Sequence, residues 1–228
     1  GAGNQVYLAS SADDQARCLS LADGRELWTH FAGAPIRLAP TLAGDRLLIG
    51  ADDGQVRCLR TIDGKLIWKA QPPELGSRLI PGNGRMIHQR PIRTGILVDG
   101  QTAYCGAGLF PTQGTFLFSL DIRDGRVLDQ EKLSISPQGY LSRRNGKLFA
   151  PTGRDPAGAF LSNLNRRGKP APLPAKSIPE KYPYAFIGAG PLRFAGGEGE
   201  VAVFREDGSL DQTLAVTGKA YGLAVIRG

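Results

Sequence analysis

The sequence lacks any apolar run long enough to cross a membrane, because no stretch approaches the ~18 consecutive apolar residues that a spanning helix needs. It also shows no leader: residues 1–4 run directly into the strand-like segment 6–9. We therefore expect the chain to begin inside a domain, as an excerpt or a processed product would. Its three cysteines, Cys18, Cys58 and Cys105, form no Cys-x-x-Cys pair. The sequence therefore shows neither the common zinc-binding spacings nor a disulfide framework.

Catalytic signatures are equally scarce. The two histidines, His30 and His88, have no Gly-x-Ser-x-Gly nucleophile elbow nearby, so no serine hydrolase is predicted. Gly106-Ala107-Gly108 is not Gly-x-Gly-x-x-Gly and opens no helix, which argues against a nucleotide site. The net charge of +7 is spread among acidic residues, so it predicts a solvated surface, and no nucleic-acid partner is expected.

Glycine and proline are abundant, with 31 and 16 residues, which favours short strands and turns over helices. The segment from Leu8 to Trp28 aligns without a gap on the segment from Leu48 to Trp68, forty positions later. Identical residues coincide at eight or more positions, including both cysteines and both tryptophans. Such agreement in one register indicates an internal repeat.

The repeat continues more weakly through an anchor glycine, usually preceded by an acid. An Asp-Gly pair between apolar runs predicts a tight hairpin turn, since glycine accepts a positive φ. Six residues before each anchor stands a small residue, which predicts a crowded packing position and a core role for Cys18 and Cys58. The anchors are Gly24, Gly64, Gly125, Gly168 and Gly208; the small residues are Cys18, Cys58, Ser119, Ser162 and Ala202.

Each copy is predicted to form four strands; in the second copy these are 36–42, 46–51, 55–60 and 66–70. Four antiparallel strands in about 40 residues are typical of one β-propeller blade, which must stack on neighbours to bury its faces. We therefore predict an all-β propeller of four-stranded antiparallel blades. Trp28 and Trp68, on the outermost strands, are predicted to pack against the next blade with their indole N–H bonded to backbone.

The spacing small-x-Asp-x-x-x-Gly-x-x-x-Trp resembles the tryptophan-docking motif of pyrroloquinoline-quinone (PQQ)-type propeller repeats. These occur in quinoprotein alcohol dehydrogenases and in the outer-membrane assembly lipoprotein, a non-enzymatic propeller. The match is partial: Ser20 and Arg60 replace the aspartate, and Asp129 replaces the third tryptophan. Segments 93–100 and 106–111 look like bacterial repeat proteins of the planctomycete type. The resemblance implies the fold and favours a periplasmic or cell-envelope location.

Five anchors amount to five blades' worth of chain, which we treat as a single domain over 1–228. The first residues supply strands two to four of a blade, and 220–227 look like a first strand. The ends therefore fit a closed five-bladed ring. They fit equally a part of a seven- or eight-bladed ring, which we favour because the family usually has that many blades. If the chain is such a part, other propeller blades or a companion domain are expected as its partners.

The resemblance also defines what a quinone enzyme would need: adjacent cysteines, a tryptophan beneath the quinone, a calcium site and an aspartate base. Adjacent cysteines are absent. The acid pairs Asp13-Asp14 and Asp52-Asp53 occupy repeat-equivalent turns, which favours a role in turn formation over calcium binding. We predict no catalytic residue, no metal and no cofactor, with PQQ and calcium as the alternative.

One feature exceeds the needs of the repeat. The second anchor interval carries roughly 20 extra residues, 71–90, and insertions in propellers project from one face, often the binding face. Guanidinium groups there would suit a carboxylate or phosphate. The predicted binding set is Arg78, Arg85, His88, Arg90 and Arg93. A second irregular stretch, 165–184, is rich in proline and basic residues and is either another face loop or a decayed repeat.

These observations predict a non-catalytic propeller that binds a protein or a small anionic ligand through its face loops. The alternative is a quinoprotein dehydrogenase-like oxidoreductase, or a fragment of one.

Overall fold

The computed structural model describes residues 3–82, 84–144, 147–152, 155–161, 181–182, 185–189, 191–205, 207–220 and 223. Strands dominate this part of the chain, and its only helical elements are two short 3₁₀ turns, η1 (Pro73–Leu75) and η2 (Pro111–Gln113). No helix in it is long and apolar enough to span a membrane. The predicted all-β class is confirmed.

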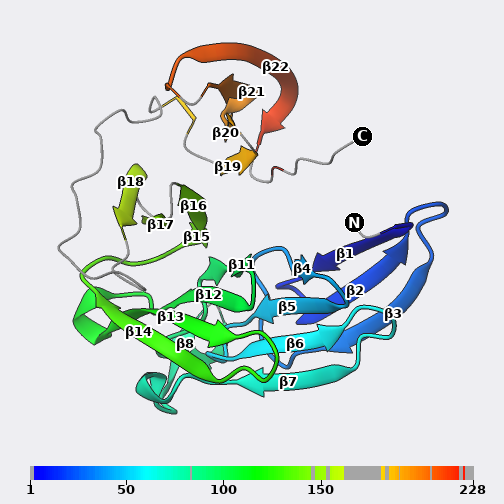
Figure 1. Ribbon diagram of the computed structural model, residues 1–228, viewed down its shortest axis with the longest axis vertical. Helices are drawn as coiled ribbons and strands as arrows, with labels where there is room; N and C mark the ends of the chain where they lie inside the picture. Colours follow the sequence, from blue (N-terminus) through cyan, green and yellow to red (C-terminus); the bar gives the residue numbers. More distant parts are fainter. Residues whose placement is uncertain are drawn as a thin grey trace.

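In the described residues, five antiparallel sheets of three or four strands follow one another along the chain, each with strands in sequence order (Figure 1). The first has three strands, as predicted: β1 (Gln5–Ala9), β2 (Gln15–Ser20) and β3 (Glu26–Phe31). The second has four: β4 (Thr41–Ala43), β5 (Arg46–Gly50), β6 (Val56–Arg60) and β7 (Leu66–Ala70). The third has four: β11 (Leu97–Asp99), β12 (Thr102–Ala107), β13 (Thr115–Asp121) and β14 (Val127–Leu133).

The fourth and fifth sheets are β16 (Ser142–Arg144), β17 (Lys147–Thr152) and β18 (Asp155–Leu161), then β19 (Ala185–Ala189), β20 (Leu192–Gly196), β21 (Glu198–Phe204) and β22 (Leu210–Lys219). Short inner segments link the blades. Among them β10 (Thr94–Gly95) pairs in parallel with β15 (Gly139–Tyr140). The anchor Gly168, most of 165–184, and most of 220–227 lie outside the described residues.

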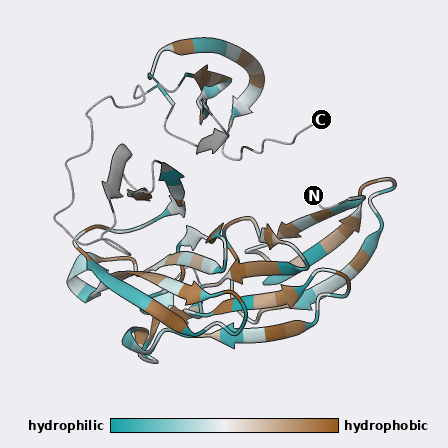
Figure 2. Cartoon of the chain, in the orientation of Figure 1, coloured by the Kyte–Doolittle hydropathy of each residue, from teal (hydrophilic) through white to brown (hydrophobic). Residues whose placement is uncertain are grey.

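The core lies in layers between blades. The five sheets are the blades, numbered 1 to 5 in chain order. One apolar cluster joins blades 1 and 2, a second joins blades 2 and 3, and a third joins blades 3 and 4. Figure 2 shows apolar residues concentrated on the central strands of these blades. Stacked sheets that bury both faces against neighbours are the packing that a propeller requires.

Two details of the predicted repeat are wrong. The first strand of blade 2 is Thr41–Ala43, shorter than 36–42, since the prolines at 35 and 40 restrict the preceding backbone. The gapless alignment also fails within β1. Tyr7 pairs with Cys18 as Leu48 pairs with Cys58, so Leu8 is not the equivalent of Leu48. The reason is that the β1–β2 turn is one residue longer than the β5–β6 turn.

Both tryptophans donate their indole N–H to the backbone of the next blade. The indole Nε1–H of Trp28 donates to the Thr61 carbonyl oxygen at 2.8 Å, and that of Trp68 donates to the Ile122 carbonyl oxygen at 3.0 Å. Cys18 and Cys58 are 0% exposed and lie directly across the sheet from these tryptophans, as their predicted packing role requires. Burial raises the pKa of both thiols, which keeps them protonated and unreactive.

Candidate functional site

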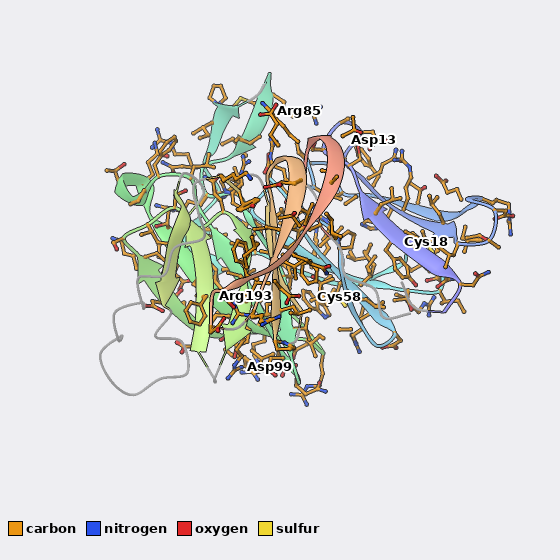
Figure 3. All side chains as sticks on the ribbon, turned by 90° about the horizontal axis from the view of Figure 1, so that it is seen from above. Asp13, Cys18, Cys58, Arg85, Asp99 and Arg193 are labelled. Atoms are coloured by element: carbon orange, nitrogen blue, oxygen red, sulfur yellow. The ribbon has the colours of Figure 1, made fainter. Side chains whose placement is uncertain are left out.

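The extra segment 71–90 forms η1 and a β-hairpin of β8 (Leu79–Gly82) and β9 (Arg85–His88), which we call the insert hairpin. It belongs to the connection between blades 2 and 3. Figure 3 shows it projecting on the side of Asp13, while Asp99 lies at the opposite side.

The base of the insert hairpin is fixed by His88, which is 2% exposed. Its Nδ1 accepts the backbone N–H of Arg90 at 3.0 Å, and its Nε2 lies 2.9 Å from the Gly76 carbonyl oxygen. Both contacts are satisfied by the neutral ring with the proton on Nε2. The His88 backbone N–H also donates to the Asp52 carbonyl oxygen at 2.8 Å, which ties the hairpin to blade 2.

Arg90 ties the same hairpin to blade 3. Its Nε–H donates to the Gln113 carbonyl oxygen at 2.7 Å, and its Nη1 donates to the Leu75 carbonyl oxygen at 3.0 Å. The guanidinium also lies over the Phe116 ring, 5.7 Å from its centroid. These contacts occupy the guanidinium with acceptors of the protein itself.

Arg85 reaches blade 1. Its Nη1 donates to both carboxylate oxygens of Asp14, at 2.7 and 2.8 Å. Asp14 has a φ of +62°, a left-handed conformation that is uncommon outside glycine, at the position where blade 2 has Gly54. The insert hairpin is therefore held by all three of the first blades.

A charge cluster around one buried carboxylate lies on the same side of blades 2 and 3. Asp52, 0% exposed, accepts from Arg37 Nε at 2.8 Å and lies 3.4 Å from Arg93 Nη2. Burial lowers the pKa of Arg93, an effect that the Asp52 carboxylate opposes. Asp52 Oδ1 and Arg93 Nε have no hydrogen-bond partner among the described residues. The two cations outnumber the one anion, so the cluster carries a net positive charge.

Sequence reasoning missed Arg37 and the role of Asp52. The available signal was a repeated tripeptide, Pro-Ile-Arg, at 35–37 and 91–93. Both copies occupy the inner segment of a blade: the Pro35 carbonyl oxygen accepts the Asp52 N–H, and that of Pro91 accepts the Gly108 N–H, each at 2.9 Å. The repeat therefore places two guanidinium groups side by side around one carboxylate.

The predicted basic set is thus distributed over several contacts. Arg85, Arg90 and Arg93 bind different acceptors of the protein, and His88 is buried beneath the hairpin. Arg78 is exposed, and its side chain makes no hydrogen bond or ion pair within the described part of the chain. Leu79 and Met86, on the hairpin face that also carries His88, are exposed by 55% and 57%. That anions bind this set stays a prediction.

The predicted turn acids are engaged by arginines. Asp13 pairs with Arg17, and Asp53 pairs with Arg57, in repeat-equivalent positions. Across the described residues, no group of three or more histidine, cysteine or acidic side chains is arranged to hold a metal ion. A cavity of about 400 Å³ lies between blades 2 and 3, lined by turn residues on the side of Asp99; its lining includes Asp45, Arg46 and Gln101.

Comparisons with known proteins agree with this architecture. The sequence profile described as outer membrane protein assembly factor BamB matches residues 1–154. No curated protein matches the chain. Among solved structures, BamB from Moraxella catarrhalis has a TM-score of 0.54 at 13% identity, with 93% of this chain and 58% of that chain covered.

Two further structures share the fold. A protein of unknown function from Bacteroides caccae has a TM-score of 0.61 at 11% identity, covering 93% of this chain and 73% of that one. The quinohemoprotein alcohol dehydrogenase ADHIIG from Pseudomonas putida HK5 has a TM-score of 0.55 at 10% identity, covering 93% and 40%. The chain thus spans little more than half of the BamB structure. With its stacked four-stranded blades and docked tryptophans, it belongs to the BamB family of PQQ-like propeller repeat proteins.

Proposed function

We propose that the chain is a non-catalytic propeller module that binds a protein partner through the insert hairpin. The carrying observation is the combination of rigid support and exposed apolar surface. His88, Arg90 and Arg85 fix the hairpin to the blades, while Leu79 and Met86 remain more than half exposed. Apolar side chains held in place in this way lower the entropy cost of binding.

The charges beside this surface indicate the partner's chemistry. Arg78 is exposed at the start of the hairpin, and the Arg85 side chain is 42% exposed even when paired with Asp14. We infer a partner segment with apolar residues flanked by acids. A small anion alone is favoured less, because it would have to displace the carbonyl and carboxylate partners of Arg85, Arg90 and Arg93.

The family description, an outer membrane protein assembly factor, supports both a protein-binding role and a periplasmic or cell-envelope location. We treat residues 1–228 as one propeller domain, complete as five blades or part of a larger ring. The oxidoreductase alternative rests on the fold shared with the alcohol dehydrogenase.

The residues of this chain do not fit PQQ. The sequence has two tryptophans, and both are docked between blades with their N–H groups bonded to carbonyls, so neither is free to stack under a quinone. The three cysteines are separate from one another and buried. The turn acids are paired with arginines, which leaves no carboxylate among them free to serve as a base or a calcium ligand.

The test is a peptide selection. Random peptides displayed on phage are selected on the intact chain, and the winners are titrated against two double variants by calorimetry. Leu79→Ser with Met86→Ser should weaken binding by about tenfold or more, the loss expected when two apolar contacts are removed. The matched control is Ile62→Ser with Leu128→Ser, since those side chains are also exposed, by 74% and 43%, but lie elsewhere.

Two results would contradict the proposal. One is a set of selected peptides that bind the Leu79/Met86 variant as well as the parent chain. The other is stoichiometric binding of PQQ in the presence of calcium, accompanied by dye-linked oxidation of an alcohol, which would establish the oxidoreductase alternative.

A further inference from the structure

The sulfur atoms of the chain, in three cysteines and one methionine, differ sharply in their access to solvent. Cys18, Cys58 and Cys105 are 0% exposed, and burial raises the pKa of all three thiols. Both tryptophans are 8% exposed, whereas Met86 is 57% exposed. A thioether needs no deprotonation before it reacts, and its oxidation follows its exposure. An oxidant in solution therefore reaches Met86 before it reaches the other easily oxidised side chains.

Met86 belongs to a short apolar strip on one face of the insert hairpin. It is paired with Pro81 across the two strands, and Leu79 stands diagonally to it on the same face. Side chains in these two relations lie within reach of each other across an antiparallel pair. Pro81 and Leu79 are exposed as well. The thioether is therefore one of three neighbouring apolar groups, Leu79, Pro81 and Met86, which we call the apolar strip.

Oxidation of this thioether changes the strip and leaves the blades as they are. Met86 is absent from the apolar clusters that form the core of the described residues, so its conversion to a sulfoxide disturbs no packing between blades. The sulfoxide replaces a flexible apolar group by a polar S–O group that accepts hydrogen bonds. An apolar partner residue packed on the strip has no donor for that oxygen, and the oxygen loses its water when it is covered. The oxidised strip therefore binds an apolar segment more weakly.

We propose that Met86 is an oxidation site whose conversion to the sulfoxide switches off partner binding at the insert hairpin. The switching rests on the proposed function, whereas the selective oxidation does not.

The oxidant is hydrogen peroxide. The thioether sulfur of Met86 attacks one peroxide oxygen, and the O–O bond breaks as the S–O bond forms. The S–OH proton then passes to the departing hydroxide, which leaves as water. Sulfur loses two electrons and the peroxide gains them. A dithiol, acting through a sulfoxide reductase, returns two electrons to the sulfur, becomes a disulfide and releases the oxygen as water, so the step is reversible.

The first measurement needs no partner. The intact chain is treated with hydrogen peroxide, the peroxide is removed with catalase, and the digested chain is examined by mass spectrometry. We expect a single added oxygen atom, on Met86, with the cysteines and tryptophans unmodified and the thermal unfolding midpoint unchanged. Met86→Leu should gain no oxygen under the same conditions. Oxidation of a cysteine or tryptophan as fast as that of Met86, or a lowered unfolding midpoint, would overturn the proposal.

The second measurement uses peptides from the phage selection that contain no methionine, cysteine or tryptophan. Calorimetry with the oxidised chain should show binding weakened by about fivefold, and treatment with sulfoxide reductases and a dithiol should restore it. Met86→Leu keeps a similar volume, so it should bind as the parent does, before and after peroxide.

The outcomes separate the two proposals. Equal affinity of the oxidised and reduced chains, for peptides that require Leu79 and Met86, overturns the oxidation switch and leaves the proposed function intact. An equal loss in the peroxide-treated Met86→Leu variant also overturns the switch, because the loss would then arise at another residue. Selected peptides that never require Leu79 and Met86 contradict the proposed function, and the switch with it.

Discussion

At the scale of single residues, the anchor glycines serve two purposes that the structure separates. Every described anchor has a positive φ, from +67° at Gly64 to +85° at Gly208, which its turn requires. Gly64 and Gly125 also support an indole ring, where a side chain has no room. Gly24 has only the first constraint within the described structure.

Alanine substitution at two of these glycines should therefore give unequal losses. Gly24→Ala is expected to cost about 1–2 kcal/mol, from the left-handed backbone alone. Gly64→Ala should cost about 1–3 kcal/mol more, because its Cβ would overlap Trp28. Urea unfolding followed by tryptophan fluorescence measures both free energies of unfolding. Equal losses would show that the Trp28 contact with Gly64 does not constrain this position.

At the scale of secondary-structure elements, the insert hairpin depends on a few anchoring contacts. Antiparallel pairing of β8 and β9 gives only a two-stranded sheet, which is marginal by itself in water. The Arg90 guanidinium donates hydrogen bonds to the backbone carbonyl oxygens of Gln113, Glu74 and Leu75. The order of this element therefore rests on one side chain more than on its own strand pairing.

We expect Arg90→Ala to release the hairpin without unfolding the blades. Hydrogen exchange measured by mass spectrometry should become at least about tenfold faster over residues 71–90, while β5, β6, β12 and β13 keep their protection. Arg78→Ala is the control, since Arg78 is exposed and belongs to the same segment. Unchanged exchange in the Arg90 variant would show that the hairpin is held by other contacts.

At the scale of the whole molecule, carboxylate–arginine pairs reinforce the turns of successive blades. The Arg60 guanidinium lowers the pKa of Asp63 to about 2, and hydrogen bonds from Arg123 hold the pKa of Asp121 far below its usual value. The two pairs use opposite orders along the turn: blade 2 has arginine at the position where blade 3 has Asp121. The partner residues are not equivalent, because Arg123 lies one position before Asp124, which is the equivalent of Asp63.

These pairs predict acid sensitivity. Both carboxyl groups have a lower pKa in the folded protein, so as pH falls below about 4 the unfolded chain takes up protons first. The stability that they contribute at neutral pH is lost progressively as pH falls toward about 2. Urea midpoints measured at pH 7, 4 and 2.5 should decrease, with a shallower decrease in Asp121→Asn. An identical pH dependence in that variant would exclude Asp121 as a contributor.

The repeat and the all-β class were predictable from the sequence because they rest on local spacing. The two tryptophan contacts join blades across 33 and 54 positions, and they were predictable only because the spacing repeats. An Asp-Gly pair requires its turn wherever it occurs, and the 40-residue register places Cys58 across from Trp68 as it places Cys18 across from Trp28. The one-residue shift in β1 escaped detection because turn length varies without changing the composition of the strand.

The candidate site was predictable only in its location. Extra length between two anchors indicated the insert hairpin, and the inward or outward direction of its side chains depended on neighbours far along the chain. Arg85 meets Asp14 across 71 positions, and Arg93 meets Asp52 across 41. The sequence determined the blades, because each is closed by contacts within about 40 residues. The tertiary structure alone decided which of the described arginines are paired within the protein and which apolar residues stay exposed, because those properties arise where blades meet.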